Sequence, residues 1–90
     1  MEISFDPIKR ALTLANRGLD FADAARVFDG PTFTQQDTRF AYPEDRFQTY
    51  GLLAERLVML VWAKTSDGRH IISMRTCNDR EQAQYRQRLG

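Results

Sequence analysis

The stretch Arg56–Thr76, RLVMLVWAKTSDGRHIISMRT, decides the fold of this chain. Every residue from position 57 to position 63 is apolar, which is typical of a strand that is covered on both faces. Asp67 and Gly68 then form a pair that tolerates positive φ and suits a short hairpin loop. A second, mostly apolar run returns over His70–Met74. The pattern predicts a central strand at Leu57–Lys64 with an antiparallel partner over 70–76.

Arg75 follows the second run directly. Simple alternation would place Arg75 on the face of Ser73 and Ile71, opposite Met74 and Ile72. An arginine at the end of a buried strand offers rigid, bidentate recognition of an anion such as phosphate. Position alone leaves a second interpretation open, in which Arg75 pairs with a neighbouring carboxylate.

Two helices are predicted ahead of the sheet, after a possible edge strand at Ile3–Phe5. Asp6 followed by proline favours a helix start, and Gly18 favours its end. A second helix is predicted over Asp20–Asp29. The first helix carries an apolar face at helical spacing, formed by Ile8, Ala11, Leu12 and Ala15. We expect the two helices to form a hairpin that covers one face of the sheet.

The remaining segments complete an α+β pattern. Thr32–Gln36 is β-prone but polar and is expected at a sheet edge, and Arg46–Leu53 is predicted to be a strand with one polar face. Asn78 and Glu81 form a capping-box pattern for a final helix over 79–89. The sequence therefore predicts one domain over 1–90. Its antiparallel sheet of three to four strands carries an N-terminal helical hairpin and a C-terminal helix.

Composition excludes several classes of protein. The net charge of +1 argues against a protein that coats nucleic acid by charge alone, although 11 of the 13 basic residues are arginine. No apolar run reaches the length of a membrane span, and the N-terminus lacks the apolar core of a signal peptide. The single cysteine, Cys77, excludes an intrachain disulfide and is expected to be an unreactive, half-buried thiol. A cytoplasmic location is expected.

The chemistry that remains rests on arginines. His70 is the sole histidine and is expected to be structural, which excludes a Ser-His-Asp triad and a histidine-rich metal site. Arg46 and Arg75 could converge on one sheet face and bind a scissile phosphate. Metal-free RNA cleavage needs little more, because RNA supplies its own 2′-hydroxyl nucleophile. Proton transfer would fall to Glu44, Asp45, Glu81 or Tyr85. The alternative is that Glu44–Arg46 and Glu81–Arg75 are ordinary surface pairs.

Four aromatic residues lie in or beside polar stretches, where a core of this size has little use for them. They are Phe33, Phe40, Tyr42 and Tyr50. Aromatic anchors are common at protein interfaces. We therefore expect some of the four to form an exposed patch that binds a partner.

A series of residues along the whole chain matches one known pattern. The series consists of Phe5, Asp6, Lys9, Gly18, Phe21, Ala24, Ala25, Val27, Phe28, Asp29, Pro31, Glu44, Arg46, Gly51, Arg56, Ile71, Ile72, Ser73, Met74, Arg75, Glu81 and Tyr85. In this order they resemble the BrnT family of type II toxins, which are ribonucleases paired with a BrnA antitoxin. The resemblance implies a RelE-like fold and a metal-independent endoribonuclease that arrests growth. It also implies a BrnA-like antitoxin as partner and operator DNA contacted only through that antitoxin. From the residues themselves we expect no cofactor, metal or membrane.

The chain departs from the family pattern just before Gly18. The family usually has Lys-His there and an asparagine three residues ahead, whereas this chain has Asn16-Arg17 and Thr13. Arg17 could replace the usual residues in binding phosphate, and we expect Lys9, Arg17 and Arg80 to contact RNA. Two other functions stay open: an inactive relic that only binds antitoxin, and an independent nucleic-acid-binding regulator. The net charge of +1 argues against the regulator.

Overall fold

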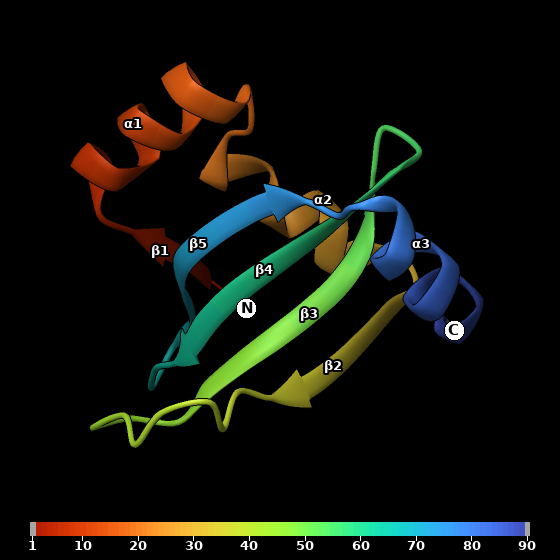
Figure 1. Cartoon of the computed structure of the whole chain (residues 1–90). Helices are drawn as coiled ribbons and strands as arrows, with labels where there is room; N and C mark the ends of the chain where they lie inside the picture. Colours follow the sequence, from red (N-terminus) through yellow and green to blue (C-terminus); the bar gives the residue numbers. More distant parts are fainter. Residues whose placement is uncertain (1, 90) are drawn as a thin grey trace.

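The computed structural model describes residues 2–89 (Figure 1). The strands are β1 (Glu2–Phe5), β2 (Thr32–Gln36), β3 (Arg46–Leu53), β4 (Arg56–Lys64) and β5 (Gly68–Thr76). The helices are α1 (Pro7–Arg17), α2 (Ala24–Asp29) and α3 (Asp79–Tyr85), with 3₁₀ turns at Phe21–Asp23 and Arg86–Arg88. The fold is α+β, as the sequence predicts. Within the described residues, none of the helices has the length and apolar character needed to cross a membrane.

The five strands form one sheet in the order β1-β5-β4-β3-β2. The central position of β4 and its antiparallel pairing with β3 and β5 confirm the predicted hairpin. The prediction of an antiparallel sheet of three to four strands is wrong, because β1 adds a fifth strand parallel to β5. Gly68 permits this pairing, since a Cβ at that position would overlap the backbone of Glu2.

A bulge in β5 changes which side chains share a face. The pairing with β4 shifts by one residue between Ser73 and Ile71, which leaves Ile72 as the extra residue. Ile72 therefore packs on the face of Ser73 and Arg75, whereas Ile71 lies on the opposite face with Met74. Simple alternation predicts the wrong face for both Ile71 and Ile72, because a bulge reverses the alternation of side chains beyond it.

Each face of the sheet has its own core. The back face packs Leu60, Trp62 and Met74 of the sheet against Phe21 and Val27, from the 3₁₀ turn and α2. The front face packs a second cluster, Tyr50, Leu57, Met59, Val61 and Cys77, against Tyr85 and Leu89 near α3. Figure 1 shows α3 over one end of the front face, while the other end carries no helix. The buried, doubly apolar β4 is what allows two cores in so short a chain.

The predicted N-terminal helical hairpin is wrong. The second helix is a 3₁₀ turn followed by the six residues of α2, and it alone covers the back face. The predicted N-cap Asp6 and the left-handed C-cap Gly18 do bound α1. However, α1 has no buried residue, and its apolar face points outward, with Ile8 71% and Leu12 57% exposed. The apolar periodicity of α1 is real, but the apolar face is turned away from the sheet.

Candidate functional site

The two predicted phosphate-binding arginines lie on the front face but do not form one site. Arg46 pairs across the sheet with Ala63, and Arg75 pairs with Met59, four residues farther along β4. Ordinary strand spacings place the two backbones about 13 Å apart along the strands and about 10 Å apart across them. The two guanidinium groups also have different partners, since Arg46 pairs with Glu44 and Arg75 with Glu81, so each arginine is considered by itself.

Arg75 lies beneath α3 in a bidentate ion pair with Glu81. Its Nη1 and Nη2 donate to Oε1 and Oε2 of Glu81, each at 2.7 Å. The hydrogen bonds from Arg75 lower the pKa of Glu81 to about 2, so this group is a carboxylate at neutral pH. The pair therefore matches the second interpretation of Arg75, in which a neighbouring carboxylate holds it.

Stacked aromatic rings fix α3 beside this ion pair. The ring of Tyr85 lies 3.9 Å from that of Tyr50 and 5.7 Å from that of Phe33, centroid to centroid. Tyr50 is buried, which raises its pKa, and it cannot belong to an exposed partner patch as predicted. Burial also raises the pKa of Cys77 to about 11, in agreement with an unreactive thiol. This end of the front face is packed rather than open.

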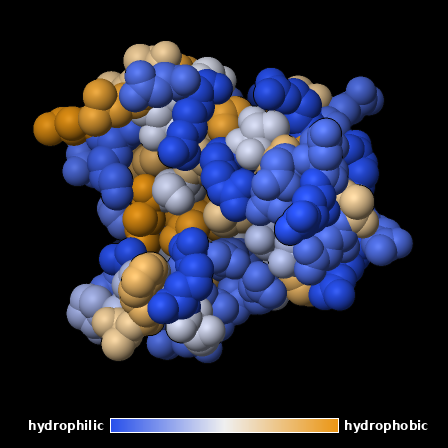
Figure 2. All heavy atoms as spheres, in the orientation of Figure 1, coloured by the Kyte–Doolittle hydropathy of each residue, from blue (hydrophilic) through white to orange (hydrophobic). Residues whose placement is uncertain are grey.

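The open end of the front face holds a cleft of about 490 Å³, which we call the front cleft. It is lined by Asp6, Lys9, Glu44, Arg46, Ala63, Lys64, Thr65, His70 and Ile72. Figure 2 shows this part of the surface hollowed between α1 and the loop that joins β2 to β3, with apolar atoms on its floor. The front cleft thus combines cations, carboxylates and an imidazole around an apolar base.

A row of paired residues crosses the floor of the front cleft. Ser4 of β1 pairs with His70 of β5, His70 pairs with Ala63 of β4, and Ala63 pairs with Arg46 of β3. Directly paired residues have their side chains on the same face. Because Ala63 is small, it leaves a gap over which the imidazole of His70 and the guanidinium of Arg46 border one space.

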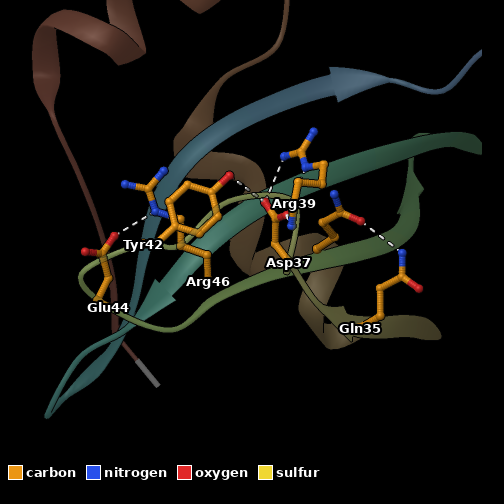
Figure 3. A network of polar contacts seen from close by, with 7 residues as sticks. Gln35, Asp37, Arg39, Tyr42, Glu44 and Arg46 are labelled. Carbon is orange, nitrogen blue, oxygen red and sulfur yellow. Dashed lines mark hydrogen bonds and ion pairs between the residues drawn. The ribbon is translucent and has the colours of Figure 1, made fainter.

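Two neighbours hold the side chain of Arg46 in place. Its Nε donates to Oε1 of Glu44 at 2.7 Å, and its Cζ lies 4.1 Å from the ring centroid of Tyr42 (Figure 3). Stacking on an aromatic ring and pairing with a carboxylate both orient a planar guanidinium. The bond to Glu44 uses Nε, so among residues 2–89 neither Nη group has a recorded hydrogen bond. Arg46 is therefore oriented and still able to bind an anion.

The β2–β3 loop is built around a buried carboxylate, Asp37. Arg39 donates to both of its oxygens at 2.8 Å, and the hydroxyl of Tyr42 donates at 3.4 Å (Figure 3). Arg39 lowers the pKa of Asp37 to about 2. This anchor fixes the ring on which Arg46 stacks. Phe40 lies against Tyr42 but is 70% exposed, and it is the most exposed of the four predicted patch aromatics.

His70 is oriented by β1. Its Nδ1 lies 3.0 Å from Oγ of Ser4, and the imidazole lines the front cleft. A hydroxyl oxygen can accept from Nδ1–H, which leaves the lone pair of Nε2 free. The lone histidine of the sequence thus lines the same cleft as Lys9, Glu44 and Arg46.

Comparison with protein-family models identifies the family of this chain. The model of a family described as ribonuclease toxin, BrnT, of type II toxin-antitoxin systems matches residues 5–81 of the 90. The chain belongs to the BrnT toxin family. No curated protein gives a match. Membership of a type II toxin-antitoxin family implies an antitoxin as partner of this BrnT toxin.

The remaining predicted site residues lie in different places. Lys9 and Glu44 line the front cleft with Arg46. Arg17 of this BrnT toxin donates from Nη1 to the carbonyl of Met74 at 2.9 Å and so ties α1 to β5. Arg80 is exposed on α3 and is not part of the cleft lining.

Sequence reasoning missed His70 and Ala63 as cleft residues. A single histidine is expected to be structural when no partner stands near it in the sequence. The pairing of His70 with Ala63 could have been predicted from the sequence. The Asp67-Gly68 turn fixes the register of β5 against β4, and this register brings His70 opposite Ala63. The contribution of Ser4 was not predictable, because β1 pairs with β5 across more than 60 residues of chain.

Proposed function

We propose that this BrnT toxin is a metal-independent endoribonuclease whose active site is the front cleft, and that it arrests growth until an antitoxin neutralises it. The observation that carries the proposal is the row in which His70 and Arg46 border one space over Ala63. A base and a fixed guanidinium on either side of a phosphate are the groups that cleavage by the RNA 2′-hydroxyl requires.

Arg46 and Lys9 bind the phosphate in this proposal. The free Nη groups of Arg46 donate to the non-bridging oxygens, and they are held by Glu44 and Tyr42 before RNA arrives. Preorganised donors of this kind stabilise charge that develops in the transition state at no further cost of reorganisation. Lys9 lines the same cleft from the first turn of α1 and adds a second cation.

His70 acts as the general base. The proposal requires the tautomer in which Nδ1–H donates to Oγ of Ser4, 3.0 Å away, so that Nε2 takes the proton of the RNA 2′-hydroxyl. The 2′-oxygen then bonds to phosphorus, the bond from phosphorus to the 5′-oxygen breaks, and the ammonium of Lys9 donates one of its own protons to that leaving oxygen. The products are a 2′,3′-cyclic phosphate and a 5′-hydroxyl. We assign no proton transfer to Glu81 or Tyr85, since both lie at the packed end of the front face.

The biological setting follows from the family. We propose a BrnA-like antitoxin as the partner, and operator DNA as a ligand only of the toxin–antitoxin complex. The toxin's own net charge of +1 is small for a protein that binds duplex DNA by itself. RNA, in contrast, needs only local cations at the front cleft.

Purified toxin and a labelled single-stranded RNA test the proposal. Arg46→Ala should lower the cleavage rate by about 10²–10³, the usual cost of one transition-state contact. Arg26→Ala is the matched control, because it removes an exposed arginine of α2 outside the front cleft and should leave the rate unchanged. Cleavage should persist in excess chelator. A folded wild-type protein that binds antitoxin but cuts no RNA would indicate an inactive relic instead.

A further inference from the structure

Helix α1 packs with its polar side towards the protein and its apolar side towards solvent. Both oxygens of Asp20 accept from Arg10, at 2.8 and 2.9 Å, and Arg17 donates to the backbone of Met74. These contacts hold the helix at both ends in one rotational setting. The outward position of its apolar side is thus fixed by the fold and is not the result of a loose helix.

The outward side of α1 is continuous and apolar. Three of the four exposed large hydrophobic side chains within the described residues belong to it: Ile8, Leu12 and Leu14. Ala11 and Ala15 lie between them on the same side and are also exposed. Apolar patches of this kind mark interaction sites on soluble proteins, and alanines allow a second helix to approach closely.

The charged side chains of α1 itself all have one sign. Helix α1 carries Lys9, Arg10 and Arg17 but no carboxylate between its bounds. Arg10 has an ion pair with Asp20, whereas no ion pair is recorded for Lys9 or Arg17 among residues 2–89. The groove between α1 and β5, of about 240 Å³, contains both of these cations, with Leu12 and Ile72 as its apolar part and no acidic residue. A complementary ligand is therefore apolar and acidic.

We propose that the outward side of α1, with the adjoining groove, docks an amphipathic helix of the antitoxin whose apolar stripe is flanked by carboxylates. The inference rests on the antitoxin partner of the proposed function. A second copy of this chain is a poor occupant, because pairing two α1 helices would bring like charges together. RNA is a poor occupant of the outward side itself, since Ile8, Leu12 and Leu14 offer a phosphate no hydrogen-bond donor.

Helix α1 is too short to form the whole interface with the antitoxin. Eleven helical residues span about 16 Å, too little for the roughly 800 Å² that each partner of a stable complex buries. The antitoxin must therefore extend past α1, and Lys9 and Ile72 line both the groove and the front cleft. An antitoxin that follows this path occupies the front cleft and excludes RNA.

The test compares two surface variants for binding of the purified cognate antitoxin by calorimetry. Ile8→Ser/Leu12→Ser should weaken binding by at least about 10-fold, the effect of losing central apolar anchors. Its melting temperature should stay within about 2 °C of wild type, because both side chains are already exposed. Phe40→Ser is the matched control: it removes an equally exposed apolar side chain on the β2–β3 loop and should change affinity by less than about twofold.

Four results overturn the inference. The first is wild-type affinity in the double variant, and the second is a loss confined to Phe40→Ser, which moves the interface to the β2–β3 loop. The third is a large drop in the melting temperature of the double variant, which means that the side is packed within the toxin. Failure of the wild-type toxin to bind the antitoxin also overturns it, while the RNA-cleavage assay decides the ribonuclease separately.

Discussion

The substitution Glu81→Gln should destabilise the protein without removing its chemistry. A glutamine at this position would keep the hydrogen bond that caps α3 but lose the ion pair with Arg75. Moving the Glu81 pKa from its ordinary 4.5 to about 2 would be worth about 3 kcal/mol if fully expressed. The Arg75 side chain is 37% exposed, so screening by solvent reduces the expected loss to about 1–2 kcal/mol.

The pH dependence of this loss has a definite sign. Because the pKa of Glu81 is lower in the folded state, the ion pair contributes fully above about pH 4.5, and its contribution disappears as pH falls through about 2. In urea unfolding followed by circular dichroism, the free energy of unfolding of the wild-type protein should exceed that of Glu81→Gln by about 1–2 kcal/mol at pH 7. This difference should shrink markedly by about pH 2.5. Asp79→Asn is the control, since it removes a carboxylate from the same helical turn without breaking a recorded ion pair, and should cost about 0.5 kcal/mol.

Two outcomes would refute this reasoning. An equal loss of stability at neutral pH and at the acidic end of the series would mean that the ionised pair does not stabilise α3. A Glu81→Gln protein of full stability that no longer cleaves RNA would move the chemistry to the packed end of the front face.

Two further variants test how the front cleft is held. Asp37→Asn should cost about 1–3 kcal/mol of stability at neutral pH, because it weakens the hydrogen bonds from Arg39 and Tyr42. It should also slow RNA cleavage, because the Tyr42 ring on which Arg46 stacks is no longer fixed. An unchanged urea midpoint and an unchanged cleavage rate would contradict this. Ser4→Ala should slow cleavage by about 10-fold with RNA affinity unchanged, since Ser4 only orients the imidazole; a change in affinity alone would assign it to RNA binding.

The fold was predictable where local pattern determines it. The doubly apolar run of β4, the Asp67-Gly68 turn and the helix caps Asp6 and Asn78 all lie where the sequence places them. The parallel pairing of β1 with β5 and the bulge at Ile72 were not predictable, because both depend on how distant strands pair. Periodicity identified the apolar side of α1, but periodicity does not say whether the sheet or another molecule covers that side.

The site was predictable in part for the same reason. Lys9, Glu44 and Arg46 do lie together, although their separation from Arg75 depends on strand register, which local pattern does not determine. The ion pair of Arg75 with Glu81 was one of two interpretations that position alone allowed, and only the packing of α3 decides between them. The Asp67-Gly68 turn sets His70 opposite Ala63, but the other neighbours of His70 in the cleft come from β1, β3 and α1, which local pattern does not place.

The central claim is that His70 is the base of a ribonuclease in the front cleft, and the cleavage rate of His70→Gln tests it most directly. Glutamine keeps a polar side chain at this position but cannot take the proton of the RNA 2′-hydroxyl. His70→Gln should therefore bind RNA normally and form the cyclic phosphate about 10²–10⁴ more slowly than the wild-type protein. A folded His70→Gln protein that cleaves RNA at the wild-type rate would contradict the account.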